Sequence, residues 1–224
     1  YLNPDYVSQI TQAQLSVSPQ LSNAMEAVKN YPTAVWLDRI AAIDGTSTKR
    51  SLQSHLDTAL EQQHSNINAQ TPMTVSIVIY NLPNRDCAAA ASNGELRLEA
   101  NGMHRYKTEY IDHIVSILKS NPAYQTLRIV TVVEPDSLPN IVTNLNSFPA
   151  CSIAEDGYRE GVAYAISQLA TVDNVYIYLD IAHSGWLGWE HPGSAANIYR
   201  QVMQSAGGEN LVQGFATNVA NYSS

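Results

Sequence analysis

Apolar and polar positions form alternating blocks along the chain, and the blocks predict strands and helices in turn. Short, nearly continuous apolar runs rich in β-branched residues are typical of strands that are buried on both faces of a sheet. Such runs predict strands at 33–37, 74–80, 127–133, 175–181 and 211–216. Apolar residues spaced three or four apart predict helices at 48–64, 104–119, 154–169 and 194–204. A further helical pattern over 4–29 is expected to break near Pro19.

This alternation of strand and helix favours a parallel sheet covered by helices. Two architectures fit it, an open doubly wound sheet and a (β/α) barrel. Polar and aromatic residues follow nearly every predicted strand. In a barrel the carboxyl ends of all strands meet at one face, whereas an open sheet gathers its site at one switch point. We therefore expect a barrel.

The chain is expected to be one catalytic domain over 1–224, because no repeat, linker or low-complexity segment divides it. Five strands are nevertheless fewer than the seven or eight that a closed barrel of this kind needs. The sequence also ends directly after the last predicted strand. We therefore expect that the domain is incomplete at its C-terminus.

Composition narrows the class of partner. Only 14% of the residues are charged, which is typical of secreted proteins that act on neutral polymers. The net charge is −8 and the 12 basic residues are scattered, so we expect no nucleic-acid partner and no attraction to an anionic membrane. No apolar run reaches the roughly 20 residues of a membrane span. No phosphate-binding glycine motif follows a strand, and the six histidines show no metal-ligand spacing, so no cofactor or metal is expected.

Paired carboxylates end the predicted strand at 127–133. Glu134 and Asp136 are two residues apart, and residues at that spacing share a face of a strand, so both are expected to point into one site. A carboxyl group near apolar walls and another carboxylate has a raised pKa and is suited to general acid catalysis. The alternative is structural, because Asp136 is also well placed to cap a helical turn at 137–144.

Two other segments carry chemistry. Arg85 and Asp86 lie side by side in a long loop over 83–102, where the plain alternative is a surface ion pair. Trp186 and Trp189 lie among glycines after the strand at 175–181, and exposed indole rings suit stacking against sugars, although tryptophan also fills cores. No nucleophile elbow accompanies His183 and its neighbouring serine, which disfavours a serine hydrolase.

The two cysteines leave two possibilities open. Cys87 and Cys151 are either buried thiols or a disulfide that closes a long loop.

At these motifs the sequence resembles glycoside hydrolase family 6, and within it the fungal cellobiohydrolases of the cellobiohydrolase II type. The resemblance runs through nearly the whole chain in five segments with the family's order and spacing. They are VWLDRIAA at 35–42, VIYNLPNRDCAAAASNGE at 78–95, VVEPDSLPNIVTNL at 132–145, YLDIAHSGWLGW at 178–189 and GFATNVANY at 214–222.

The resemblance implies a distorted (β/α) barrel of about seven parallel strands, of which this chain supplies about five. It implies hydrolysis of β-1,4-glucosidic bonds in cellulose with inversion at the anomeric carbon, and release of cellobiose from non-reducing chain ends. The expected protein is a secreted, extracellular monomer whose partners are cellulose and cello-oligosaccharides. An endo-acting glucanase of the same family and a non-catalytic carbohydrate-binding fragment remain as alternatives.

The resemblance also implies a role for individual residues of the catalytic centre. Asp136 matches the proton donor, and Asp86 matches a second aspartate that raises the donor's pKa and steadies the transition state. Tyr80 matches a tyrosine that presses on the distorted sugar, and Ser92 matches a serine that helps to hold the water. Arg85 is expected to orient Asp86. The family's further aspartate, tryptophan and lysine lie beyond the end of this sequence, so the catalytic base is not assigned.

Other matched positions contact sugar or form a disulfide in the family. The sugar-contacting positions are Trp36, Asp38, Asp180, His183, Trp186, Trp189 and Asn221. Cys87 and Cys151 match a disulfide that tethers the loop of Asp86. Asn221 also begins the only glycosylation sequon, and we expect it to be unmodified because a glycan there would obstruct the substrate.

Overall fold

The computed structural model describes residues 1–65, 71–188 and 191–220, and within this part of the chain five parallel strands form one sheet. They are β1 (Val35–Leu37), β2 (Thr74–Ile79), β3 (Arg128–Val133), β4 (Val175–Asp180) and β5 (Gly214–Ala216). The order of the strands across the sheet is their order along the chain. This order has no switch point, as expected for a segment of a barrel and not for a doubly wound sheet.

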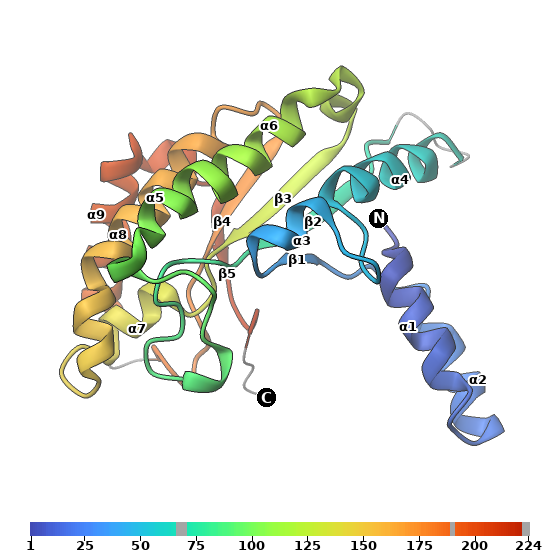
Figure 1. The fold of residues 1–224 in the computed structure, drawn as a ribbon, viewed down its shortest axis with the longest axis horizontal. Helices are drawn as coiled ribbons and strands as arrows, with labels where there is room; N and C mark the ends of the chain where they lie inside the picture. Colours follow the sequence, from blue (N-terminus) through green and yellow to red (C-terminus); the bar gives the residue numbers. More distant parts are fainter. Residues whose placement is uncertain (66–70, 189–190, 221–224) are drawn as a thin grey trace.

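The predicted helices connect successive strands. They are α4 (Leu52–Ser65), α6 (Asp112–Ser120), α8 (Pro149–Leu169) and α9 (Pro192–Ala206). In Figure 1, α6, α8 and α9 lie together on one side of the sheet. Helix α8 begins at Pro149 and not at residue 154, since proline is favourable in the first turn of a helix.

The sheet buries alternate residues of each strand against these helices. On β2, for example, Val75, Ile77 and Ile79 are inaccessible to solvent and belong to the same core as Ile114 of α6 and Ile166 of α8. The opposite face, which a barrel turns inward, is less covered. The register aligns Trp36, Val78, Val132, Tyr178 and Gly214 across all five strands on that face.

The segment before α6 departs from a regular helix. Helix α5 (Gly102–Arg105) is followed by a π-helical turn over Tyr106–Ile111, where the sequence predicts one continuous helix. Tyr106 and Tyr110 lie in this turn with ring centroids 5.5 Å apart, and both are completely buried. Such π-helical turns are frequent at functional sites.

The remaining elements are short. Helix α3 (Ile40–Asp44) was not predicted, whereas α7 (Ser137–Thr143) corresponds to the helical turn considered at 137–144. The loop 83–102 contains two 3-10 turns, Ala90–Ser92 and Leu98–Ala100. Further 3-10 turns cover Pro122–Thr126 and Glu209–Leu211. The predicted break near Pro19 is confirmed: α1 (Pro4–Gln14) and α2 (Pro19–Val28) form a helix pair that projects from the sheet in Figure 1. No helix in the described ranges is long and apolar enough to cross a membrane.

Candidate active site

The candidate site lies where the strands end, and the backbone there is unusual. Left-handed conformations with positive φ are uncommon for residues other than glycine, and they cluster at functional sites. Here they occur at Asn84 and Asp86 after β2, Glu134 and Asp136 after β3, Ala182 after β4, and Asn218 after β5. These turns aim the side chains that follow the strands, and their recurrence supports a site at the carboxyl face of the sheet.

Asp136 is the half-buried carboxyl group at the start of α7. Its φ is 65°, and its side chain makes no capping hydrogen bond, so the geometry does not favour the helix-cap interpretation. Its backbone N–H donates to Asp180 Oδ2 at 2.8 Å. Burial raises the pKa of Asp136 to about 7, and the charges of Asp180 and Asp86 add to the rise. Asp136 therefore keeps its proton up to about neutral pH, as a general acid must.

Asp86 and Tyr80 form the second part of the site. Asp86 is buried, and the Tyr80 hydroxyl donates a hydrogen bond to Asp86 Oδ2. Burial, and then the bond to Asp86, raise the pKa of Tyr80, so its hydroxyl remains a donor. The Trp36 ring meets the Tyr80 ring edge-on with centroids 5.5 Å apart. Two aromatic rings and a carboxylate therefore stand together at the ends of β1 and β2.

Arg85 contacts Tyr80 and the backbone. Its guanidinium carbon lies 4.0 Å from the centroid of the Tyr80 ring. Its Nη1 donates to the carbonyl oxygens of Asp38 at 2.9 Å and Tyr80 at 2.5 Å, and its Nε donates to that of Ser92 at 3.0 Å. No ion pair between Arg85 and Asp86 is present in the described part of the chain. The interpretation of Arg85 and Asp86 as a surface ion pair is therefore wrong. Arg85 instead connects the segments of Asp38, Tyr80 and Ser92 by bonding to their carbonyl oxygens.

Ser92 and Asp38 are held near this arginine through their backbone. The Ser92 hydroxyl donates to the Ala89 carbonyl at 3.4 Å, at the end of the 3-10 turn Ala90–Ser92. The Asp38 carboxylate forms an ion pair with Arg39 at 3.4 Å. Both residues are thus brought beside the Tyr80 and Asp86 group, and their roles toward a substrate remain predictions.

Asp180, His183 and Trp186 form the part of the site that follows β4. Asp180 is buried, and burial raises its pKa. Its carbonyl oxygen accepts from the Tyr199 hydroxyl at 2.6 Å. The indole N–H of Trp186 donates to Thr143 Oγ1 of α7 at 2.8 Å, and its ring lies 6.3 Å from that of His183. Trp186 is therefore attached to the helix that Asp136 begins.

The structure overturns one expectation, that Glu134 and Asp136 point into the same site. Glu134 is only 1% exposed, and its carboxylate bonds to the backbone of Asn81 and Leu82 and to the hydroxyl of Tyr106. The alternation of faces requires extended backbone, but β3 ends at Val133 and both acidic residues have positive φ.

The disulfide is confirmed. Cys87 and Cys151 are joined, which connects the loop of Asp86 to α8. The Tyr158 hydroxyl of α8 supports the same loop, because it donates to Asn84 O at 2.7 Å and accepts from Cys87 N at 3.2 Å. The helical layer thus holds the loop by one covalent and two polar connections.

Two predicted sugar-contacting residues, Trp189 and Asn221, lie outside the described residues. Among the residues that are described, no three histidine, cysteine, aspartate or glutamate side chains form a group that could hold a metal ion.

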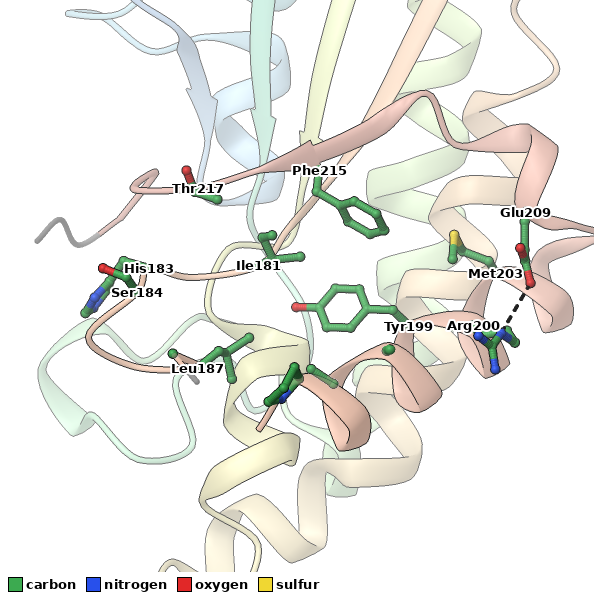
Figure 2. A pocket seen from close by; sticks show the side chains of 14 residues that line it. Ile181, His183, Ser184, Leu187, Tyr199, Arg200, Met203, Glu209, Phe215 and Thr217 are labelled. Carbon is green, nitrogen blue, oxygen red and sulfur yellow. Dashed lines mark ion pairs between the residues drawn. The ribbon is translucent and has the colours of Figure 1, made fainter. Parts of the chain in front are cut away.

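A cavity of about 620 Å³ lies apart from the carboxyl groups, beside β5 and α9. Figure 2 shows its mostly apolar wall, with Tyr199, Met203 and Phe215 toward the middle and the Arg200–Glu209 ion pair of 3.7 Å at one end. Of the candidate site residues in the described part of the chain, only His183 lines it. The other described candidate residues therefore lie outside the lining of this cavity.

The sequence did not identify the buried tyrosines behind the site. The hydroxyl of Tyr110 donates to Leu37 O at the end of β1 and accepts from Tyr80 N at 2.9 Å. Tyr106, Tyr158 and Tyr199 make comparable contacts at the other strand ends. In the sequence these tyrosines look like ordinary apolar positions of helices. The one hint of a hydrogen-bonding role was that tyrosine occurs where phenylalanine would pack equally well.

A half-buried carboxyl group whose pKa is raised to about 7, a second carboxyl group that accepts from a tyrosine, and flanking aromatic rings are features that acid-catalysed cleavage of a glycosidic bond requires. The chain belongs to glycosyl hydrolases family 6, whose family model matches residues 1–224.

Similar proteins include two that are named exoglucanases. The chain is 45% identical to Exoglucanase A of Cellulomonas fimi, over 99% of this chain and 25% of that protein. It is 39% identical to Exoglucanase 3 of Agaricus bisporus, over 99% of this chain and 46% of that protein. This chain therefore spans a quarter to about half the length of these relatives.

Solved structures show the same fold. The catalytic domain of Cellulomonas fimi Cel6B superimposes with a TM-score of 0.90 at 44% identity, covering 99% of this chain and 50% of that one. Cellobiohydrolase II (Cel6A) of Humicola insolens, in complex with glucose and cellotetraose, gives a TM-score of 0.89 at 40% identity and covers 100% and 59%.

Proposed function

We propose that the protein containing this chain hydrolyses β-1,4-glucosidic bonds in cellulose and releases cellobiose from non-reducing chain ends. The observation that carries the proposal is the Asp136 carboxyl group, whose pKa is raised to about 7 by burial and by Asp180 and Asp86. The names of similar proteins support it, since these are exoglucanases and 1,4-β-D-glucan cellobiohydrolases.

In the proposed mechanism Asp136 gives its proton to the glycosidic oxygen as the bond to the anomeric carbon breaks. The sugar then carries positive charge, which the Asp86 carboxylate stabilises while the Tyr80 hydroxyl holds that carboxylate in place. A water molecule attacks the opposite face of the anomeric carbon and passes its proton to a general base, which is not assigned to a residue of this chain. Attack on the opposite face inverts the configuration. Trp36 and Trp186 are proposed to contact the neighbouring glucose units, with Asp38, His183 and Ser92 as further substrate-site residues.

Secretion as a monomer is part of the proposal. The Cys87–Cys151 disulfide supports an oxidising compartment, because disulfides persist outside the cytosol. The partners are cellulose and cello-oligosaccharides. A similar enzyme, CcCel6A, has been solved in complex with p-nitrophenyl β-D-cellotrioside.

Product analysis tests the proposal. The whole protein is incubated with swollen cellulose and with cellohexaose, and soluble products are separated by chromatography while proton NMR follows the anomeric configuration. Cellobiose as the main product, first formed as the α-anomer, is expected. Mixed oligomers with a rapid fall in viscosity would instead favour the endo-acting alternative. That alternative is disfavoured because the long loop over 88–102 and the stretch SLPNIVTNL at 137–145 resemble those of the tunnel-forming exo-acting members. Binding without any hydrolysis would support the non-catalytic alternative and contradict the proposal.

A further inference from the structure

Glu134 is a buried carboxylate that the proposed mechanism does not use. Its side chain is 1% exposed at the end of β3. It forms no ion pair in the described ranges, although the charge of Arg85 acts on it from a distance. Burying a carboxylate without a cationic partner is costly unless hydrogen bonds satisfy its oxygens. The groups that bind it therefore indicate why the protein retains it.

Each of these groups is a donor. The backbone N–H of Asn81 lies 3.1 Å from both Oε1 and Oε2, and the N–H of Leu82 lies 3.2 Å from Oε2. The Tyr106 hydroxyl of the π-helical turn donates to Oε1 at 2.8 Å. The backbone of Glu134 is fixed as well, because its N–H donates to Ile79 O at 2.8 Å.

These contacts connect the two segments that carry the candidate catalytic carboxyl groups. Glu134 lies two residues before Asp136, while Asn81 and Leu82 begin the segment that leads to Asp86. We propose that Glu134 is a positioning residue that sets the separation of Asp136 and Asp86, and that Tyr106 holds its carboxylate for this purpose. This inference rests on the proposed function and extends it to residues that do not touch the substrate.

The charge of Glu134 matters because in each of its side-chain hydrogen bonds the partner is the donor. A protonated Glu134 would point its hydrogen at a backbone N–H group, or the Tyr106 hydroxyl would have to turn from donor to acceptor, and in either case a present hydrogen bond would be lost. Burial raises the pKa of Glu134 to about 7, while the bonds from Asn81, Tyr106 and Leu82 and the charge of Arg85 lower it. Tyr110 of the π-helical turn and Tyr158 of α8 are the other titratable groups that face it.

The sharpest variant is Tyr106→Phe, which removes one oxygen atom. Tyr124→Phe is a matched control, because Tyr124 is equally buried and its hydroxyl also donates to a carboxylate, that of Asp57 at 2.6 Å, but before β3 begins. In the whole protein we expect Tyr106→Phe to lower kcat on cellotetraose about tenfold or more, with KM within about twofold, since small misplacements of reacting groups are that costly. Tyr124→Phe should leave both constants within about twofold.

The pH profile separates positioning from mere support of the fold. Without the Tyr106 hydroxyl Glu134 takes up its proton more readily, so the acidic limb of kcat should move to higher pH in Tyr106→Phe and stay in place in Tyr124→Phe. Glu134→Gln, which cannot ionise, should lower kcat across the whole pH range. Melting temperatures of all variants report whether they fold.

Each outcome has a distinct meaning. An active wild type, with equal kcat and equal acidic limbs in Tyr106→Phe and Tyr124→Phe, would overturn the role of Glu134 and leave the proposed function intact. An inactive wild type would overturn the proposed function together with this role. A Glu134→Gln variant that does not fold leaves the decision to Tyr106→Phe.

Discussion

The two ends of strand β3 use buried polar groups in opposite ways. Before β3, neutral amides satisfy the backbone: Asn174 Nδ2 donates to Tyr124 O and Leu127 O, and Gln63 Oε1 accepts from Met73 N. After β3, the polar groups include the carboxyl groups of the buried Glu134 and the half-buried Asp136. Hydrogen bonds satisfy polar groups at both ends, but the acidic side chains that are withdrawn from solvent lie at the carboxyl end, whereas Asp57 at the amino end is exposed.

Neutral amides and buried carboxyl groups have different effects on the stability of the fold. A neutral amide that meets backbone groups stabilises the fold at every pH. A buried carboxyl group with a raised pKa destabilises the fold as pH rises from about 4 toward 7, because the unfolded chain gives up the proton first. The pKa is raised to about 7 at Asp136, after β3, and is also raised at Asp180, the last residue of β4. The raised pKa values at the carboxyl end of the sheet therefore lower the stability of the fold at neutral pH, and they are also what proton transfer at a catalytic site requires.

The largest expected effect follows from removing the proton donor. Asp136→Asn should lower hydrolysis of cello-oligosaccharides about 10²–10⁴-fold and leave their binding nearly intact, because only a transition-state proton transfer is lost. Asp57→Asn, on the amino side of the sheet, should stay within about twofold of wild type. Initial rates and calorimetric binding constants measure both. Comparable activity in Asp136→Asn and wild type would refute the assignment.

The second largest effect is expected from removing the disulfide, which lies at the carboxyl end of the sheet. Replacing Cys87 and Cys151 together with alanine should lower the free energy of unfolding by about 3–4 kcal/mol on the chain-entropy model. Because the loop of Asp86 then loses its covalent connection to α8 and keeps only noncovalent contacts such as those of Tyr158, kcat should fall as well. Urea denaturation and initial rates test this. A stability equal to that of wild type would show that the loop does not depend on the disulfide.

The smallest effect concerns the amino end. Asn174→Ala removes the donor shared by two carbonyl oxygens and should cost about 1–3 kcal/mol of the free energy of unfolding. The kcat of Asn174→Ala should equal that of wild type, whereas Asp136→Asn should lower kcat. A loss of kcat in folded Asn174→Ala protein would mean that the two ends of β3 are coupled and would break the comparison.

The sequence predicted the strands and Asp136 because their signals are local. Continuous apolar runs mark buried parallel strands, and a carboxylate directly after such a run marks the carboxyl face of the sheet. The direction of the Glu134 side chain was expected from the alternation of faces along an extended strand. That alternation does not hold at Glu134 and Asp136, because both residues have positive φ.

Other features depend on contacts between distant segments. Arg85 appears beside Asp86 in the sequence, yet its hydrogen bonds go to Asp38, Tyr80 and Ser92. Tyr106 fits an apolar helical stripe, and only the π-helical turn places its hydroxyl against Glu134. Asp38 lies 47 residues from Arg85 and Glu134 lies 28 residues from Tyr106, and hydrophobic periodicity carries no information about such pairs.

The ionisation of Asp136 tests the central claim most directly. Carbon-13 NMR of the labelled side-chain carboxyl group gives its pKa without reference to activity, in wild type and in Asp180→Asn. We predict a pKa of about 7 in wild type and a lower value in Asp180→Asn, since the Asp180 charge is one cause of the rise. A wild-type pKa near the ordinary 3.8 would contradict the assignment of Asp136 as the proton donor.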